Sequence, residues 1–322
     1  MSAVEQYIRP KDVDRRATRG QRLLWRIETL AWDGLYWGPV KLLSPERASD
    51  FGGWVFKQVG RFLSQHKTML RNLRLAFPSW SENEIQATAL KAWESAGRTA
   101  GELPHLPKIN PYAGDRVEVV GAEHLDAIRE SGRGAVLVSG HFANWEVMAA
   151  VICRRPLDCL VTYRALNNPH IDRRLNHVRH AYGIDVLAPK GVGTREVMRA
   201  LSNNRSVAFL NDQKFNGGLA VPFFGHDAMT AQGPSRLALK YNVPVVPVST
   251  VRTGPARFRV TVHAPLKAQH SADEERDVRL MVEQITAFIE RNVRAQPEQW
   301  FWMHRRWPKE AWRAADAYGA SA

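Results

Sequence analysis

The sequence predicts an α/β protein with a mainly parallel or mixed sheet flanked by helices, and with a helical N-terminal region. From Val117 onward, short apolar runs alternate with helical segments, which is the pattern of βαβ units. Before Pro104 the periodicity is helical only. The clearest helix there covers residues 81–102 and starts with Ser81 and Glu84, a capping-box pair.

The order of the expected elements follows from this alternation. Strands are expected at residues 117–120, 135–139, 159–163, 184–187, 206–211, 243–250 and 257–262. Helices are expected at 122–130, 144–152, 170–182, 194–203 and 233–241, and an amphipathic helix at 273–293 closes the core. These boundaries predict a flexible N-terminus at 1–20, a helical and membrane-associating region at 21–110, an α/β core at 111–312 and a flexible C-terminus at 313–322.

The composition favours anionic partners. The 322 residues include 45 lysines and arginines against 32 acidic residues, for a net charge of +13. Nucleic acid, anionic lipid headgroups and an acidic carrier protein all suit such a surface. The charge is spread along the chain and no nucleic-acid-reading module is present, which argues against nucleic acid as the partner. The 11 tryptophans suit both membrane interfaces and protein cores.

The two cysteines and the acidic residues show no metal-binding pattern. Cys153 and Cys159 have a C-x5-C spacing that fits neither a zinc site nor a redox pair, so we expect buried thiols in a reducing compartment. No candidate acid stands beside a cysteine or a second histidine at metal-ligand spacing. We therefore expect no metal and no cofactor.

The first 43 residues predict association with a membrane surface and no spanning helix. Residues 1–20 are polar and lack the apolar core of a secretory signal. Residues 23–43 are more apolar but carry four charges, at Arg26, Glu28, Asp33 and Lys41. A spanning helix needs about 20 residues with few charges. The interspersed aromatic residues fit a helix lying on a bilayer, although an amphipathic helix packed on the core would look the same.

The most informative motif is SGHFANWE at residues 139–146, which places His141 and Glu146 at an H-x4-E spacing. Gly140 ends a strand and Asn144 is a candidate helix cap, so His141 lies in the turn between them. Five residues of straight helix turn by about 500°, so the two side chains meet only if His141 folds back over the first helical turn. Glu146 would then hold one ring nitrogen, and the other could take a proton from a substrate hydroxyl. Alternatively, His141 caps the turn and Glu146 favours the helix dipole.

Two further charged residues follow predicted strands. Arg164 comes after residues 159–163 and Asp212 after residues 206–211, so both belong to the edge of a parallel sheet that carries His141. Arg164 could stabilise an oxyanion or bind an acceptor phosphate, or be a solvated charge at a strand end. Asp212 could orient Arg164 or His141, or cap a turn.

The motif SGHFANWE resembles the H-x4-D/E motif of the lysophospholipid-acyltransferase superfamily. It is most similar to the branch of lauroyl/myristoyl acyltransferases that add secondary acyl chains to lipid A. Other blocks resemble the same branch, in the family's order over about residues 70–310: RNLRLAFP at 71–78, GE at 101–102, TYRALNNP at 162–169, NDQ at 211–213, VPFFG at 221–225 and PEQWFWMHRRWP at 297–308.

This resemblance implies an O-acyltransferase at the cytoplasmic face of the inner membrane, as a peripheral or monotopic protein. A His141–Glu146 dyad would move an acyl chain directly from a thioester to a hydroxyl of a lipid A precursor, without an acyl-enzyme. The donor would be an acyl carrier protein or acyl-coenzyme A, and the basic surface favours the acidic carrier. The acceptor could instead be another glycolipid, an aminolipid or a phospholipid. A basic nucleic-acid-binding protein is the remote alternative.

The densest aromatic and cationic cluster lies near the C-terminus. Its members are Trp300, Trp302, His304, Arg305, Arg306 and Trp307. Arginines bind phosphates bidentately and tryptophans anchor at interfaces, so this cluster could contact a phosphorylated headgroup or the membrane. The alternative is a packed C-terminal segment whose arginines reach out to solvent.

Overall fold

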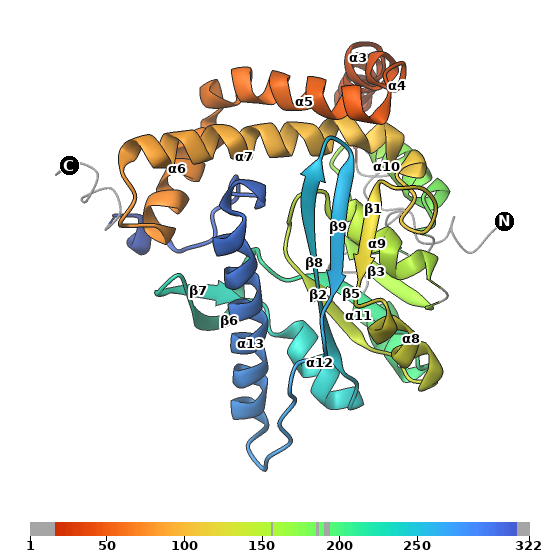
Figure 1. Cartoon of the computed structure of the whole chain (residues 1–322), viewed down its shortest axis with the longest axis vertical. Helices are drawn as coiled ribbons and strands as arrows, with labels where there is room; N and C mark the ends of the chain where they lie inside the picture. The colour runs from red at the N-terminus through yellow and green to blue at the C-terminus, as the bar shows by residue number, and fades with distance from the viewer. Residues whose placement is uncertain (1–16, 156, 185–186, 190–193, 314–322) are drawn as a thin grey trace.

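The computed structural model describes residues 17–155, 157–184, 187–189 and 194–313. Within them the chain forms a seven-stranded sheet covered by helices, as Figure 1 shows, and the predicted α/β class is confirmed. Both segments expected to be flexible, 1–20 and 313–322, lie almost wholly outside the described residues. The strands run in the order β1 (Val117–Val120), β9 (Arg257–Val262), β8 (Val245–Gly254), β2 (Val136–Ser139), β5 (Ser206–Leu210), β3 (Cys159–Tyr163) and β4 (Leu187–Pro189).

All neighbouring strands are parallel except β8 and β9, which are antiparallel. The register pairs Ser139 with Leu210 at the ends of β2 and β5. It also pairs Cys159 with Ser206 at the starts of β3 and β5. The carboxyl ends of β2, β5 and β3 therefore lie side by side at one edge of the sheet, where α/β proteins place their sites.

Helices cover both faces of the sheet because alternate residues of each strand point to opposite faces. Leu137 packs with residues of α8 (Glu123–Glu130) and α9 (Trp145–Arg154). Val136 and Val138 pack on the other face with residues of α11 (Thr194–Ser202), α12 (Gly233–Tyr241) and α13 (Glu274–Ala295). Strand β2 is thus buried along its whole length, which explains its unbroken apolar sequence.

The N-terminal region is helical, as predicted. It consists of α3 (Arg19–Ala31), the π-helix η1 (Trp32–Trp37), α4 (Gly38–Lys41), α5 (Pro45–Val59), η2 (Gly60–Phe62), α6 (Ser64–Ala76), α7 (Glu82–Glu102) and η3 (Leu103–Lys108). The capping box of α7 is confirmed, with Ser81 accepting from the Glu84 amide and Glu84 accepting from the Ser81 amide. Figure 1 shows α5 and α7 side by side across the end of the sheet at which β8 finishes.

Two elements differ from the sequence prediction. Strand β4 covers Leu187–Pro189, and residues 185–186 of the run expected at 184–187 lie outside the described residues. A hairpin of β6 (Lys214–Phe223) and β7 (His226–Thr230) was not predicted at all. Five of the ten residues of β6 are exposed, and the strand contains Gly217 and Gly218. It therefore lacks the alternation of apolar and polar residues by which a strand is recognised in a sequence.

No disulfide joins the two cysteines, which both lie in the described part of the chain. Cys159 is buried as expected, whereas Cys153 is partly exposed. Burial raises the pKa of the Cys159 thiol well above its usual value. No helix in the described part of the chain combines the length and the apolar character that a bilayer crossing requires.

Candidate active site

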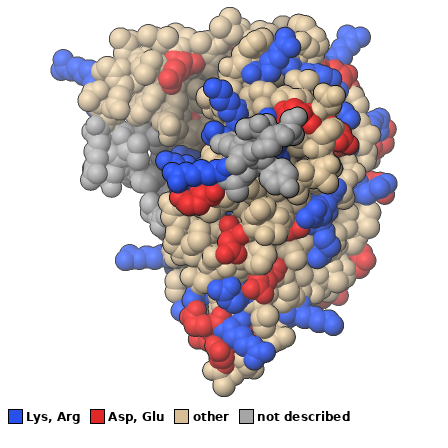
Figure 2. Space-filling view, turned by 90° about the vertical axis from the view of Figure 1, so that its left-hand side faces the viewer, with Lys and Arg blue, Asp and Glu red and all other residues tan. Residues whose placement is uncertain are grey.

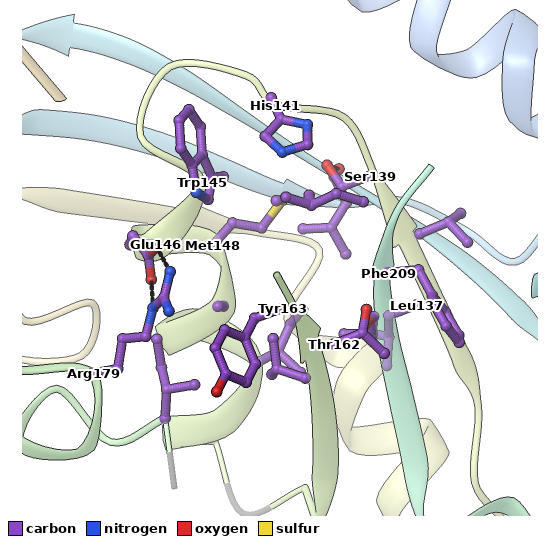
Figure 3. Close-up of a pocket in the computed structure, with 18 of the residues that line it drawn as sticks. Leu137, Ser139, His141, Trp145, Glu146, Met148, Thr162, Tyr163, Arg179 and Phe209 are labelled. Carbon is purple, nitrogen blue, oxygen red and sulfur yellow. Dashed lines mark hydrogen bonds and ion pairs between the residues drawn. The ribbon is translucent and has the colours of Figure 1, made fainter. Parts of the chain in front are cut away.

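A cavity of about 210 Å³ opens at the carboxyl ends of β2, β3 and β5. Its apolar wall comes from Leu137 of β2, Val161 of β3, Ala208 of β5 and two residues of α9, Met148 and Ile152. Polar side chains gather at the same cavity: Ser139, His141, Glu146, Thr162, Arg164, Arg179 and Gln213. Figure 3 shows most of these side chains, with His141 on the loop that leaves β2. An apolar pocket with a few convergent polar groups is a typical ligand site.

His141 lies in a tight turn between β2 and α9. Ala143 has a positive φ of 41°, a conformation that is uncommon outside glycine and is found at functional turns. A Cβ atom on Gly140 would lie 3.1 Å from the Asp212 carboxylate, so glycine leaves room for that group. Asn144 caps α9 as predicted, because its side chain accepts a hydrogen bond from the Glu146 amide at 3.2 Å.

The hydrogen-bonding partner of His141 is Asp212. The ring Nδ1 donates to Asp212 Oδ1 at 2.7 Å, and the His141 backbone amide donates to Oδ2 at 2.7 Å. Asp212 is fully buried. Burial alone would raise the pKa of this carboxyl, but the charge and hydrogen bonds of His141 hold it well below its usual range. Asp212 thus contacts both the ring and the backbone of His141, which combines two of the roles considered for it, orienting the histidine and capping its turn.

The hydrogen bond expected between His141 and Glu146 is not formed, and that part of the predicted dyad is wrong. Glu146 faces Arg179 of α10 (Pro169–Ala181) instead, with bidentate contacts of 2.9 and 2.5 Å, as Figure 3 shows. The reason is the geometry of α9: Glu146 lies in its first turn, and the side chain points away from the loop that carries His141. Burial acts to lower the pKa of Arg179, and Glu146 more than offsets this and raises it.

A second buried charge network supports the start of α9. Asn144 donates to Glu102 Oε2 at 2.9 Å, and Ser49 donates to Glu102 Oε1 at 2.7 Å. Arg252 of β8 forms an ion pair with the same carboxylate. Both Glu102 and Arg252 are buried, so each charge depends on the other for compensation. Through Asn144, this pair fixes the helix that follows the His141 turn.

Arg164 and Gln213 complete the polar rim. Arg164 is exposed and lines the cavity next to the end of β3, so it shares the sheet edge with His141 as expected. Gln213 was not among the predicted site residues. Its Nε2 lies 3.5 Å from His141 Nε2, a long and weak contact that a substrate hydroxyl can replace. Its position directly after Asp212 was the signal that could have identified it.

The C-terminal cluster does not form the surface that its composition predicts. Trp302, Arg306 and Trp307 are buried, so the prediction that they contact a headgroup or the membrane is wrong. Arg306 donates to Met229 O and to Thr230 Oγ1 of β7, and burial lowers its pKa to about 10. The prediction failed because a sequence of mixed aromatic and cationic residues is equally compatible with a buried segment and with a segment on the surface. Arg305 is exposed, with its guanidinium 5.6 Å from the Trp312 ring.

His304 lies behind Asp212. Its Nδ1 contacts Phe301 O at 2.8 Å and its Nε2 lies 3.3 Å from Asp212 O. Burial lowers the pKa of His304 to about 4, so the ring is neutral at pH 7. This environment therefore does not favour the predicted contact between a charged His304 and a lipid headgroup. In the described part of the chain, no three His, Cys, Asp or Glu side chains gather as a metal site would require.

The chain is similar in sequence to known bacterial acyltransferases. The family model described as "Bacterial lipid A biosynthesis acyltransferase" matches residues 22–309. The phosphatidylinositol mannoside acyltransferase of Mycobacterium tuberculosis is 27% identical over 84% of this chain and 86% of its own length. The lipid A biosynthesis lauroyltransferase of Escherichia coli is 26% identical, over 85% and 89%. The palmitoleoyltransferase of the same pathway in Escherichia coli is 25% identical, over 76% and 79%.

These relatives are all named acyltransferases, and the matched region includes both the N-terminal helices and the whole sheet. The protein is thus an acyltransferase, and the chain belongs to the bacterial lipid A biosynthesis acyltransferase family.

Proposed function

We propose that this enzyme transfers a fatty acyl chain from a thioester donor to a hydroxyl of a lipid acceptor, with His141 as the general base. One observation carries the proposal: His141 Nδ1 lies 2.7 Å from the Asp212 carboxylate at the edge of the cavity, and in the tautomer that donates this hydrogen bond Nε2 carries the lone pair. A neutral histidine with one nitrogen fixed by a carboxylate is suited to take a proton from an alcohol.

The reaction proceeds in two steps. The acceptor hydroxyl oxygen attacks the thioester carbonyl carbon while His141 Nε2 takes the hydroxyl proton. The tetrahedral intermediate then collapses, the carbon–sulfur bond breaks, and the imidazolium returns its proton to the leaving thiolate. The acyl chain occupies the apolar wall of Leu137, Met148 and Ala208. No covalent acyl-enzyme is involved.

The other polar residues divide into two roles. Arg164 at the exposed rim binds the acceptor phosphate or the developing oxyanion, because guanidinium groups suit both. Glu146 supports the site indirectly. Its ion pair with Arg179 holds that side chain against the wall of the cavity and fixes α10 relative to α9. This role replaces its expected place in a His–Glu dyad.

The acceptor is a lipid A precursor, and the donor is an acyl carrier protein. The family supports the acceptor, and the +13 charge favours the acidic carrier over coenzyme A. A second acceptor is another phosphorylated glycolipid, because the phosphatidylinositol mannoside acyltransferase is as similar to this chain as the lauroyltransferase is. On the face shown in Figure 2, positive and negative side chains are interspersed, which does not favour nucleic acid.

The N-terminal helices bind the surface of the inner membrane from its cytoplasmic side. Among the described residues, 11 of the 15 exposed large hydrophobic side chains lie between residues 23 and 63. Helix α3 buries none of its residues and carries Arg19, Arg22 and Arg26. Exposed apolar side chains beside arginines suit an anionic bilayer surface.

The test is mass spectrometry of lipid products from the purified enzyme. Each donor, acyl carrier protein or coenzyme A, is offered with a lipid A precursor that has a free hydroxyl and, separately, with phosphatidylinositol mannoside. We expect one added acyl chain on the lipid A precursor, and a rate about 10³-fold lower for His141→Ala.

Circular dichroism of His141→Ala serves as the control for folding. Acylation of phosphatidylinositol mannoside alone would assign the second acceptor. Wild-type rates in a folded His141→Ala would rule out the proposed base.

A further inference from the structure

The Asp212 carboxylate has a third hydrogen-bond donor in the fully buried centre of the site. Trp300 donates through its indole Nε1 to Asp212 Oδ2 at 2.7 Å. The same oxygen accepts the His141 backbone amide, and the other oxygen accepts His141 Nδ1. Trp300 itself is only 2% exposed, so no water replaces this donor.

Trp300 reaches Asp212 because the C-terminal segment is bonded to the His141 turn. Trp300 pairs with Phe142 in an antiparallel bridge. On either side, the Ala143 amide donates to Gln299 O at 2.7 Å, and the Phe301 amide donates to His141 O at 3.2 Å. The indole ring is therefore positioned by the same backbone that carries His141.

The geometry gives the two carboxylate oxygens different tasks. Two N–H groups fix Oδ2, which prevents the carboxylate from rotating and leaves Oδ1 aligned with His141 Nδ1. That alignment keeps the proton on Nδ1 and the lone pair on Nε2. Trp300 orients Asp212, and Asp212 in turn orients His141. Removing an outer hydrogen bond of this kind commonly lowers activity measurably.

Trp300 differs in this respect from a neighbouring buried tryptophan. Trp307 also has a fully buried ring, but its Nε1 donates to the backbone carbonyl of Phe223 at 3.1 Å. Packing alone explains Trp307, whereas the indole of Trp300 ends on the carboxylate that holds His141.

We propose that Trp300 is a positioning residue for acyl transfer, whose indole N–H fixes the Asp212 side chain so that Asp212 orients His141. This inference rests on the proposed function of His141. It assigns Trp300 no contact with substrate.

The test is Trp300→Phe, which keeps an aromatic ring and removes the N–H. We expect kcat to fall about 10- to 100-fold with little change in KM. Without the indole donor, more of the carboxylate's negative charge acts on His141 and favours its protonated form. The acidic limb of the pH profile of kcat/KM should therefore move to higher pH, an effect that loss of packing alone would not produce.

Trp307→Phe is the matched control, because it removes a buried indole N–H from the same segment. It should lower the thermal midpoint comparably and leave kcat and the pH profile unchanged. The inference is wrong if Trp300→Phe keeps the wild-type kcat and pH profile, or if both variants lose activity in proportion to their thermal midpoints. His141→Ala separates the two proposals: if it is inactive while Trp300→Phe matches the wild type, only the role of Trp300 fails.

Discussion

At the scale of single residues, two carboxylates compete for the role of partner to His141. Glu146 has the motif spacing, yet its oxygens both bind Arg179. Asp212 lies 71 residues further along the chain and holds both the ring and the backbone of His141. Sequence reasoning identified Asp212 because it follows a strand parallel to that of His141, but spacing could not decide which carboxylate forms the bond.

The two carboxylates should respond differently to neutral amide substitutions. Asp212→Asn keeps the shape of the side chain but removes the charge and favours the wrong tautomer of His141, so we expect kcat to fall by about 10³-fold or more. Glu146→Gln should lower kcat by about 10-fold, because it acts through Arg179. It should also cost about 3 kcal/mol of unfolding free energy, since it leaves a buried guanidinium without its counter-charge.

Steady-state kinetics and urea denaturation measure these two effects. The double variant Glu146→Gln/Arg179→Met is the control, because it removes the uncompensated charge and should recover most of the lost stability. A larger loss of kcat in Glu146→Gln than in Asp212→Asn would return Glu146 to the position of direct partner.

At the scale of elements, the sequence predicts most helices and strands because their signals are local. The capping box at Ser81, the apolar strand before Gly140 and the cap at Asn144 all depend on residues within a few positions. The β6–β7 hairpin was missed because its strands lack apolar alternation. The contacts of Trp300 were missed because they join residues far apart in sequence, and no local pattern specifies which buried group an indole will meet.

Helix pairing in the N-terminal region also depends on distant contacts. A Cβ atom on Gly97 of α7 would lie 2.2 Å from the backbone oxygen of Gly52 in α5. A Cβ atom on Gly101 would lie 2.0 Å from Ala48 O. Because the obstructing atoms belong to the backbone, the two helices can pack this closely only if both α7 positions remain glycine.

Gly97→Ala should therefore separate α5 from α7, although alanine is the better helix former. We expect a loss of about 1–3 kcal/mol in unfolding free energy, as for other overpacked sites, measured by urea denaturation. Gly20→Ala in α3 is the control, because the nearest atom to its added Cβ lies 3.9 Å away. It should be neutral or slightly stabilising. A neutral Gly97→Ala would show that the helices can move apart without cost.

At the scale of the whole molecule, the site depends on segments from both ends of the chain. Asn72 of α6 donates to the carbonyl oxygens of Trp302 and His304, and it accepts from Trp312 Nε1. The same C-terminal segment bonds to the His141 turn. The N-terminal helices thus hold the segment that carries Trp300, and they also present the exposed apolar side chains. These hydrogen bonds connect the His141 turn to the helical region that carries the surface proposed to bind the membrane.

Two exposed leucines of the N-terminal helices allow that surface to be tested. Leu35 and Leu42 are 83% and 89% exposed, so replacing both with asparagine removes apolar area that the folded protein does not use internally. Burying one such side chain in lipid contributes about 1.5–3 kcal/mol to binding, and each substitution removes part of this free energy. We therefore expect the double variant to bind vesicles about 10- to 100-fold more weakly. Flotation with vesicles of phosphatidylglycerol and phosphatidylethanolamine measures the change. Val120→Asn with Phe215→Asn is the matched control, since both side chains are exposed outside the N-terminal helices. Equal binding by the two double variants would mean that residues 23–63 are not the membrane surface.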